Sequence, residues 1–217
     1  MTTPPPAESI AASAAASTPQ RDAVLRAAAR LFRTKGYERA TVRELANAVG
    51  LRSASLFHYF ETKADILAAV MEYGLVLAAD NATRAIERGS TPHERLEYCF
   101  RYYLIGLLSE EYRDYMTVLL YDFRSLPPEL SKRVQHVRNG VEQRWQAVLE
   151  EAFPNRERSS LRLTGQFIFG AMCWALQWYN PKGTLSLEEL SRRFADLAFA
   201  TCGLAPPERS ERVSPAA

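Results

Sequence analysis

The side chains with the clearest chemical potential lie in one short segment near the N-terminus. Residues 52–59 read RSASLFHY, so Arg52, Ser53, Ser55, His58 and Tyr59 occur within eight positions. Guanidinium, hydroxyl and imidazole groups on the exposed side of a helix can hydrogen-bond base edges and phosphate oxygens. Small residues such as serine let the backbone approach the bases closely. This combination predicts a surface that enters a groove of double-stranded DNA.

Three short helices within residues 24–67 must position these side chains. The first carries an apolar stripe at helical spacing, formed by Val24, Leu25, Ala28, Leu31 and Phe32. Gly36 follows this helix, as expected for a glycine in left-handed geometry. Thr41 and Glu44 predict a capping box at the start of the second helix, and Gly50 supplies the turn before the third. Two helices joined by a short glycine-containing turn predict a helix-turn-helix motif.

The charge distribution agrees with this prediction. Residues 21–63 hold nine Lys or Arg against four acids, a net charge of +5, whereas residues 64–217 hold eighteen against twenty. A basic end is what neutralisation of DNA phosphates requires. The alternative is a solvated basic face on a small helical domain, and the capped helix-turn-helix favours DNA over it.

The same segment resembles the DNA-binding domain of the TetR/AcrR family of transcriptional regulators. The pattern appears as AAARLF, then KGYERATVRELANAVGL, then SLFHYFETKADIL. The resemblance implies an all-α fold, with an N-terminal three-helix DNA-binding domain and a six-helix C-terminal domain for effector binding and dimerisation. It implies DNA contacts by Thr41, Arg43, Arg52, Ser53, Ala54, Ser55, Phe57, His58, Tyr59 and Lys63.

Individual roles follow from that resemblance. Thr41 and Lys63 correspond to phosphate-binding positions, and Arg43 is placed to reach a base edge, where arginine prefers guanine. Two positions depart from the commonest pattern, because Ala54 replaces a frequent glycine and Phe57 a frequent tyrosine. Phe57 has no hydroxyl for a phosphate, so its contact would be apolar, or its ring would lie partly in the core. Arg52 is either a DNA contact or a solvated side chain.

The rest of the chain reads as helices with almost no strand signal. We expect helices over residues 64–88, 92–108, 112–123, 128–153, 160–179 and 187–202, giving nine in all. The expected organisation is a disordered tail (1–20), the DNA-binding domain (21–66), the effector and dimerisation domain (67–204) and a second disordered tail (205–217). A secretory signal is not expected, nor is an uninterrupted apolar run of membrane-spanning length, which favours a cytoplasmic protein.

Aromatic residues gather in the C-terminal part and suit a core as well as a cavity. The family resemblance implies an effector cavity framed by its middle helices. The residues expected to line it are Tyr103, Tyr115, Met116, Leu119, Trp145, Phe169, Cys173 and Gln177. Three cysteines, Cys99, Cys173 and Cys202, show no pairing or metal spacing, so we interpret them as buried small residues in preference to a thiol sensor.

The stretch MCWALQWYNPKGTLSLEELSRRFADLAFATCGL is similar to a subgroup of TetR-like repressors that control fatty-acid, aromatic or steroid catabolism and respond to CoA thioesters. Such an effector needs an apolar slot for its acyl chain and cations for its phosphates. Arg138, Arg144 and Arg162 lie on helices that could supply them, and the alternative for each is a solvated helix residue. The second candidate effector is a lipophilic cation, recognised by the aromatic residues and by Glu110, Glu111 or Asp114 in a regulator of a drug efflux pump.

The last two expected helices carry apolar residues at three- and four-residue spacing, with small residues among large ones. This pattern predicts a four-helix dimer interface across a twofold axis. Its expected members are Phe167, Gly170, Ala171, Trp174, Trp178, Leu190, Phe194, Leu197, Ala198 and Thr201. Such a dimer would read a palindromic operator, and the resemblance implies that an effector releases it.

Other classes of function are disfavoured. The three histidines, His58, His93 and His136, lie beside no nucleophile and have no metal-ligand spacing. There is no glycine-rich phosphate loop and no distinctive pair of carboxylates. The sequence therefore predicts neither catalytic residues, nor a metal site, nor a bound cofactor.

Overall fold

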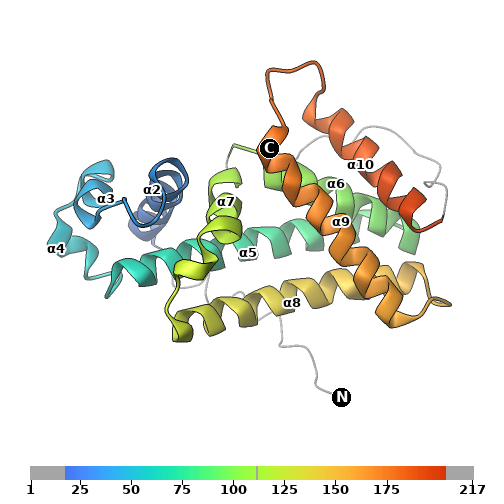
Figure 1. Cartoon of the computed structure of the whole chain (residues 1–217), viewed down its shortest axis with the longest axis horizontal. Helices are drawn as coiled ribbons and strands as arrows, with labels where there is room; N and C mark the ends of the chain where they lie inside the picture. Colours follow the sequence, from blue (N-terminus) through green and yellow to red (C-terminus); the bar gives the residue numbers. More distant parts are fainter. Residues whose placement is uncertain (1–17, 111, 204–217) are drawn as a thin grey trace. The chain divides into compact units, whose positions relative to one another are not determined.

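A computed structural model of the chain describes residues 18–110 and 112–203. Within these residues the structure consists of nine α-helices, one short 3-10 helix and no strand (Figure 1), which confirms the predicted all-α fold. The helices are α2 (Pro19–Lys35), α3 (Val42–Ala48), α4 (Ser53–Leu56), α5 (Lys63–Arg88), α6 (Pro92–Leu108), α7 (Arg113–Tyr121), η1 (Phe123–Ser125), α8 (Pro128–Ala152), α9 (Arg158–Trp178) and α10 (Leu187–Thr201).

The chain forms two compact units whose limits differ from the expected domain boundary at residue 66. The first unit contains the described residues up to Ala78 together with Glu110–Glu142. The second contains Ala79–Ser109 together with the described residues from Gln143 onward. Helix α7 therefore belongs to the same unit as the DNA-binding helices. Most of the two predicted tails lies outside the described residues.

Helix α2 begins inside the segment expected to be a tail. The Thr18 side chain accepts a hydrogen bond from the backbone N–H of Arg21 (3.2 Å), and Pro19 occupies the first turn, where its missing N–H costs nothing. The Thr18 cap and the proline together explain why the helix begins at Pro19. The helix ends at Gly36, whose φ of 81° confirms the predicted positive φ.

The predicted capping box at the start of α3 is confirmed. The Thr41 hydroxyl accepts from the Glu44 N–H (3.2 Å), while the Glu44 carboxylate accepts from the Thr41 N–H (3.0 Å). Gly50, with φ of 70°, makes the turn between α3 and α4. Leu45 and Leu56 are buried on either side of this turn, so they hold the two short helices together.

Helix α7 packs against α5 at a glycine. A Cβ atom at Gly74 would lie only 3.0 Å from Tyr115 Cβ, so only glycine allows this close approach without displacement. The Tyr115 ring packs against Tyr73, with centroids 5.1 Å apart, and is buried. Burial raises the pKa of the Tyr115 hydroxyl, and Tyr73 adds to the shift.

Helix α7 is also tied to the DNA-binding helices by polar contacts. Arg33 of α2 forms an ion pair with Asp114 in the first turn of α7. Arg26 of α2 hydrogen-bonds the Tyr115 side chain. At the other end of α7, Asp122 interacts with the backbone N–H of Tyr37, while burial raises the pKa of this carboxyl. Contacts at its two ends therefore hold α7 on α2 and on the loop that follows α2.

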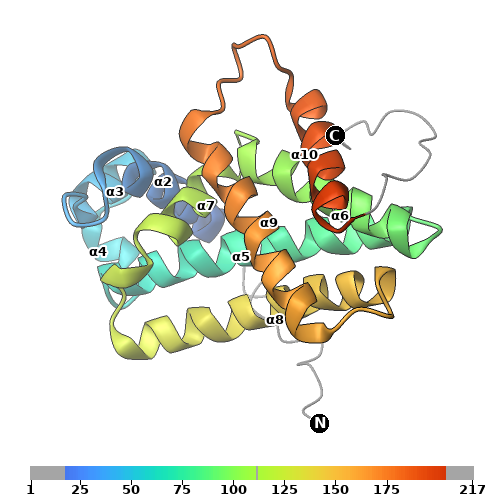
Figure 2. The same ribbon diagram turned by 45° about the vertical axis from the view of Figure 1, so that its right-hand side comes forward.

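In the second unit, α10 runs beside α6, and α9 also packs on α6 (Figures 1 and 2). Phe199 of α10 lies edge-on to Phe100 of α6, with centroids 6.2 Å apart. Arg156 donates to the carbonyl oxygen of Cys202 (2.6 Å), which satisfies an acceptor at the end of α10. Gly89 closes the turn from α5 to α6, since a Cβ there would lie 2.4 Å from the backbone nitrogen of Arg95.

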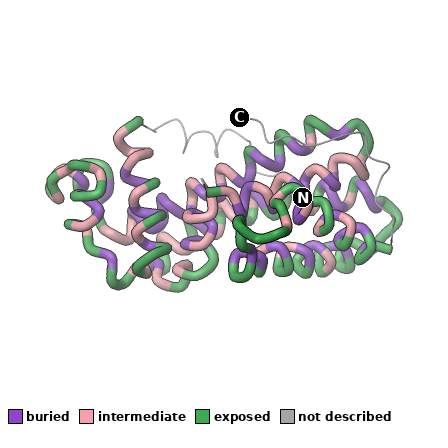
Figure 3. The backbone as a smooth tube through the Cα atoms, turned by 90° about the horizontal axis from the view of Figure 1, so that it is seen from above, coloured by how far each residue is buried: buried purple, intermediate pink, exposed green. Residues whose placement is uncertain are grey.

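Buried and exposed residues alternate along most of the helices, as the colour changes along the tube in Figure 3 show, whereas no residue of α6 is exposed. Among the described residues, only α5 is long and apolar enough by composition to cross a membrane. In this fold, 67% of its most apolar window is buried inside the protein, as expected for a core helix.

Candidate DNA-binding, effector and dimer surfaces

The segment expected to contact bases is a single turn of helix followed by a turn. Leu56 and Phe60 are buried and anchor it, which leaves the side chains between and before them outside. Phe57 is 50% exposed, so the alternative of a core position does not hold for its ring. The other exposed members of the predicted set are Arg52, Ala54, His58 and Tyr59, and the half-buried ones are Ser53 and Ser55.

Arg43 and Thr41 differ in how far their side chains are available. Arg43 is exposed on α3. The Thr41 hydroxyl is engaged within the capping box, where it also donates to the Glu44 carboxylate (3.0 Å). Lys35 pairs with that carboxylate, and this hydrogen bond, together with those from Thr41, lowers the pKa of Glu44 to about 2. The charge of Glu44 is thus neutralised locally.

Lys63 is held in place by the loop between α2 and α3. Its ammonium donates to the carbonyl oxygen of Glu38 (3.2 Å) and lies 4.2 Å from the centroid of the Tyr37 ring. An ammonium has three N–H donors, so this contact leaves donors for a phosphate. Thr62 and Asp65 form a hydrogen-bonded cap at the start of α5, which fixes the backbone around Lys63.

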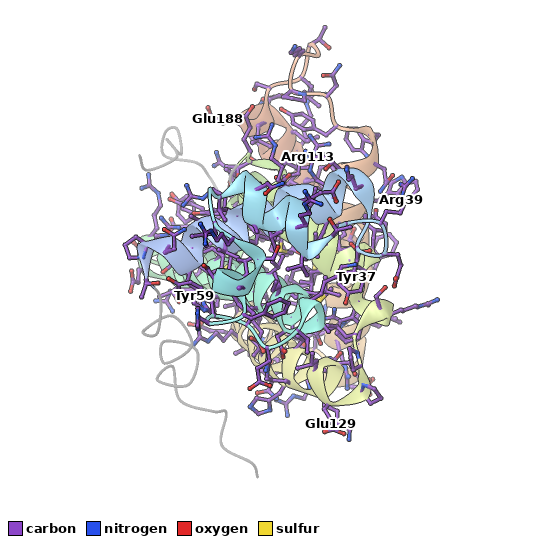
Figure 4. All side chains as sticks on the ribbon, turned by 90° about the vertical axis from the view of Figure 1, so that its left-hand side faces the viewer. Tyr37, Arg39, Tyr59, Arg113, Glu129 and Glu188 are labelled. Atoms are coloured by element: carbon purple, nitrogen blue, oxygen red, sulfur yellow. The ribbon has the colours of Figure 1, made fainter. Side chains whose placement is uncertain are left out.

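Arg39 is a candidate DNA contact that the sequence analysis did not identify. It is exposed on the loop between α2 and α3, and its Nε donates to the carbonyl oxygen of Lys35 (2.8 Å). This bond fixes the guanidinium group, whose two Nη atoms remain as further donors. Figure 4 shows Arg39 and Tyr59 on either side of α3 and α4. The sequence feature that could have identified Arg39 as a candidate was its position between Gly36 and Thr41, in the loop before α3.

We expect Arg39→Ala to weaken binding to operator and unrelated DNA by similar factors, because an interaction with phosphate carries no sequence information. The slope of log K against log salt concentration should become shallower by about 0.9 for each phosphate that the variant no longer neutralises. Fluorescence anisotropy across a salt series measures both. Arg39→Lys keeps the charge but removes the hydrogen bond from Nε. Its affinity for DNA should therefore lie between those of the wild-type protein and Arg39→Ala. Arg124→Ala, on η1, is the control, and an unchanged salt slope in Arg39→Ala would contradict the assignment.

Four of the residues expected to line the effector site come together in the second unit. The Trp145 ring of α8 lies edge-on to Tyr103 of α6 and Phe169 of α9, with centroids 5.5 and 4.8 Å apart. Tyr103 and Phe169 are also edge-on to each other (5.0 Å). The Tyr103 hydroxyl lies 3.4 Å from Cys173 Sγ. We call these four residues the aromatic cluster.

The aromatic cluster has one polar atom without a partner. Trp145 is 3% exposed, and its Nε1 has no hydrogen-bond partner. Leaving a buried donor unsatisfied costs about 1–3 kcal/mol. The other three members of the cluster are half-buried, so the group is accessible from their side.

The other predicted effector residues do not join this cluster. Tyr115, Met116 and Leu119 are buried on α7 in the first unit, where α2 and α5 account for their apolar spacing. Arg138, also in the first unit, places its guanidinium 4.5 Å from the centroid of the Phe123 ring. Two further predicted effector residues, Arg162 and Gln177, lie on α9 in the second unit and are exposed.

Helix α9 presents a large apolar surface to solvent. Phe167 and Trp174 are each 65% exposed, and Leu197 of α10 is 64% exposed. The Trp178 ring stacks on Phe194 with centroids 6.4 Å apart, which joins the exposed sides of α9 and α10. The small exposed residues between the large ones are Gly170, Ala171 and Thr201. We call this surface the α9/α10 face.

Two residues expected in the dimer interface lie elsewhere. Leu190 and Ala198 are each 3% exposed and belong to the core of the second unit, because they lie on the side of α10 that packs inward. Conversely, the expected set omitted Leu163, which is 73% exposed and precedes Phe167 by one helical turn. Apolar residues recur at three- and four-residue spacing on both the buried and the exposed side of α10. The spacing alone therefore did not indicate which of these residues face the core and which face solvent.

Comparison with known proteins agrees with this architecture. Residues 24–70 match the model of the bacterial regulatory proteins of the TetR family, and residues 89–202 match that of the tetracyclin repressor-like C-terminal domain. The transcriptional repressor KstR2 of Mycolicibacterium smegmatis is 26% identical over 180 residues, which cover 81% of this chain and 86% of that protein.

Two solved structures share the fold. Superantigen PfiT is 36% identical, with a TM-score of 0.71, and the match covers 88% of this chain and 98% of PfiT. AibR, solved in complex with isovaleryl coenzyme A and operator DNA, is 23% identical, with a TM-score of 0.71 and coverage of 87% and 100%. The two matching models together span most of the described residues. The chain therefore belongs to the TetR family of bacterial regulatory proteins, and it is a ligand-responsive transcriptional repressor of the type that binds operator DNA as a dimer.

Proposed function

We propose that this repressor is released from a palindromic operator by an acyl-CoA or another CoA thioester. The aromatic cluster is the observation that carries the proposal, since it offers apolar ring surface for an acyl group together with one unmatched hydrogen-bond donor. The structure of AibR with isovaleryl coenzyme A supports it by analogy of fold. We expect a DNA-binding repressor of this kind to act in the cytoplasm.

In this proposal the DNA contacts come from the exposed and half-buried side chains of α3, α4 and the following turn. Arg43 and Tyr59 reach base edges or neighbouring phosphates, and Phe57 makes an apolar contact, such as with a thymine methyl group. Lys63 and Arg39 bind the phosphate backbone and set the register of the motif. The remaining proposed contacts are Thr41, Arg52, Ser53, Ala54, Ser55 and His58.

The α9/α10 face is the proposed dimer interface, and its occupant is a second copy of this chain. Exposed apolar patches of this kind on a soluble protein mark interaction surfaces. Family members dimerise, and a twofold axis places two identical motifs on the two halves of a palindrome. We include the exposed Leu163 in the proposed interface and exclude Leu190 and Ala198, because both are buried in the core.

A lipophilic cation is the second candidate effector, and the structure gives it less support. A buried cation needs a carboxylate partner, and none of the four members of the aromatic cluster carries a carboxylate. Of the three acids considered for this role, Asp114 is paired with Arg33, Glu110 is exposed, and Glu111 lies outside the described residues.

Release requires that the effector bind one conformation of the dimer better than another, because equal affinity for both would change nothing. Residues of α6, α8 and α9 form the aromatic cluster, so a ligand bound there contacts three helices at once. We propose that the DNA-bound dimer is the state with lower affinity for the effector.

Titration of effectors against a fluorescent DNA fragment from upstream of the gene tests this proposal. Acyl-CoAs of increasing chain length should raise the dissociation constant of the DNA by about 5- to 150-fold. Free CoA, free carboxylic acids and lipophilic cations are the comparison ligands. Release by cations alone would establish the second candidate, and DNA binding that no acyl-CoA alters would exclude the first.

A further inference from the structure

The unmatched indole of Trp145 has a consequence for effector specificity. We infer that Trp145 Nε1 donates a hydrogen bond to the thioester carbonyl oxygen of the effector and so distinguishes a thioester from an otherwise equal ligand. The inference rests on the proposed function and adds to it the chemical group that is recognised and the atom that recognises it.

An indole N–H is a donor only, and Trp145 Nε1 is buried without an acceptor in the protein. Buried polar groups in folded proteins are nearly always hydrogen-bonded, so the exceptions need an explanation. A ligand oxygen that accepts from this N–H satisfies a donor for which the described protein supplies no acceptor.

Three aromatic rings surround the indole of Trp145. Phe100 stacks on it at 6.2 Å with an interplanar angle of 19°, and Tyr103 and Phe169 stand edge-on to it. These neighbours offer ring surface, and the Tyr103 hydroxyl lies beside Cys173 Sγ. The perpendicular Phe169 ring offers at most an N–H···π contact, which is weaker than a bond to a carbonyl oxygen.

In an acyl-CoA the carbonyl oxygen is the acceptor that lies at the junction of the apolar acyl chain and the polar remainder. Tyr103, Phe169 and Cys173 are half-buried, whereas Trp145 is buried. An acyl chain that enters past the half-buried members lies deeper than its own carbonyl group, so the carbonyl oxygen reaches the buried Trp145 Nε1 when the chain packs beside the indole. A carbonyl, in contrast to a carboxylate, accepts this bond without bringing a charge into an apolar site.

A matched pair of ligands tests the inference in the unmodified protein. The pair is an acyl-CoA and the S-alkyl-CoA thioether of the same chain length, in which a methylene group replaces the carbonyl. We expect the wild-type protein to bind the thioester about tenfold more tightly, as one hydrogen bond from a buried donor provides. The dissociation constants come from calorimetry without DNA, so the result is independent of the operator. Equal affinity for the two ligands would overturn the inference.

Trp145→Phe supplies the second measurement, because phenylalanine keeps an aromatic ring and removes the N–H. The ratio of the two dissociation constants should fall to about one in this variant. Tyr102→Phe, which removes a hydroxyl from the same helix as Tyr103 but outside the aromatic cluster, should keep the wild-type ratio. A ratio that persists in Trp145→Phe would assign the carbonyl to another donor and overturn the inference.

The outcomes also separate this inference from the proposed function. If both CoA ligands bind and release DNA with equal strength, the proposed function stands and the role of Trp145 is wrong. If neither ligand binds a dimer that does bind its operator, both are wrong. Thermal melting shows whether Trp145→Phe is folded, and the ligand ratio in the wild-type protein decides the question if it is not.

Discussion

A monomer is expected when Phe167 and Trp174 are both replaced by glutamate, and with it a loss of operator affinity of about a thousandfold or more. Both side chains are 65% exposed on α9, so neither substitution removes a residue from the core of the second unit. Two carboxylates on each face would meet two more across a twofold axis. Desolvation of these four like charges makes association unfavourable.

Operator affinity depends on this dimer because one motif covers only a half-site. A monomer keeps its interactions with phosphates but cannot engage the second half of the palindrome, which leaves affinity near that of nonspecific binding. Analytical ultracentrifugation and anisotropy measure the two effects on the same samples. Ala147→Glu, at an exposed position of α8, is the control. A variant that stays dimeric would show that the interface lies elsewhere.

Arg43→Ala combined with Tyr59→Ala is expected to abolish specific binding while leaving the dimer intact. Each interaction with a base edge contributes about 1–3 kcal/mol, and a dimer makes every such interaction twice. The combined effect is therefore an increase of about a thousandfold or more in the operator dissociation constant. Both side chains are exposed, so the fold of the motif does not depend on them.

The comparison between operator and unrelated DNA gives this test its specificity. Affinity for unrelated DNA should change far less, since Lys63 and Arg39 remain to bind phosphates. The same pair of residue types on another surface, Arg124→Ala with Tyr121→Ala, is the matched control. Full operator affinity in a dimeric Arg43/Tyr59 variant would refute the proposed DNA-binding surface.

Local features were predictable from the sequence because they depend on neighbours in the chain. The capping box at Thr41 and Glu44, the positive φ at Gly36, the turn at Gly50 and the order of the helices were all predicted and confirmed. Helix ends were also close, and the cap at Thr18 accounts for the early start of α2.

Packing between distant segments was less predictable. The apolar spacing on α7 indicates a buried side but not its partner, and α2 and α5 bury that side where an effector was expected. On α10, Leu190 and Leu197 fit the same spacing, yet the first is buried and the second exposed. Hydrophobic periodicity identifies a face of a helix and cannot say whether the chain itself or a second copy covers it.

The contacts of α7 with α2 affect how such a regulator can be recombined with others. A chimera that joins residues 1–66 of this chain to a foreign effector domain would leave Arg33 and Arg26 without Asp114 and Tyr115. It would also remove the buried surface that α7 gives to α2. A transplant that carries α7 along with the first three helices keeps these partners together, so the portable module of this protein is discontinuous in sequence.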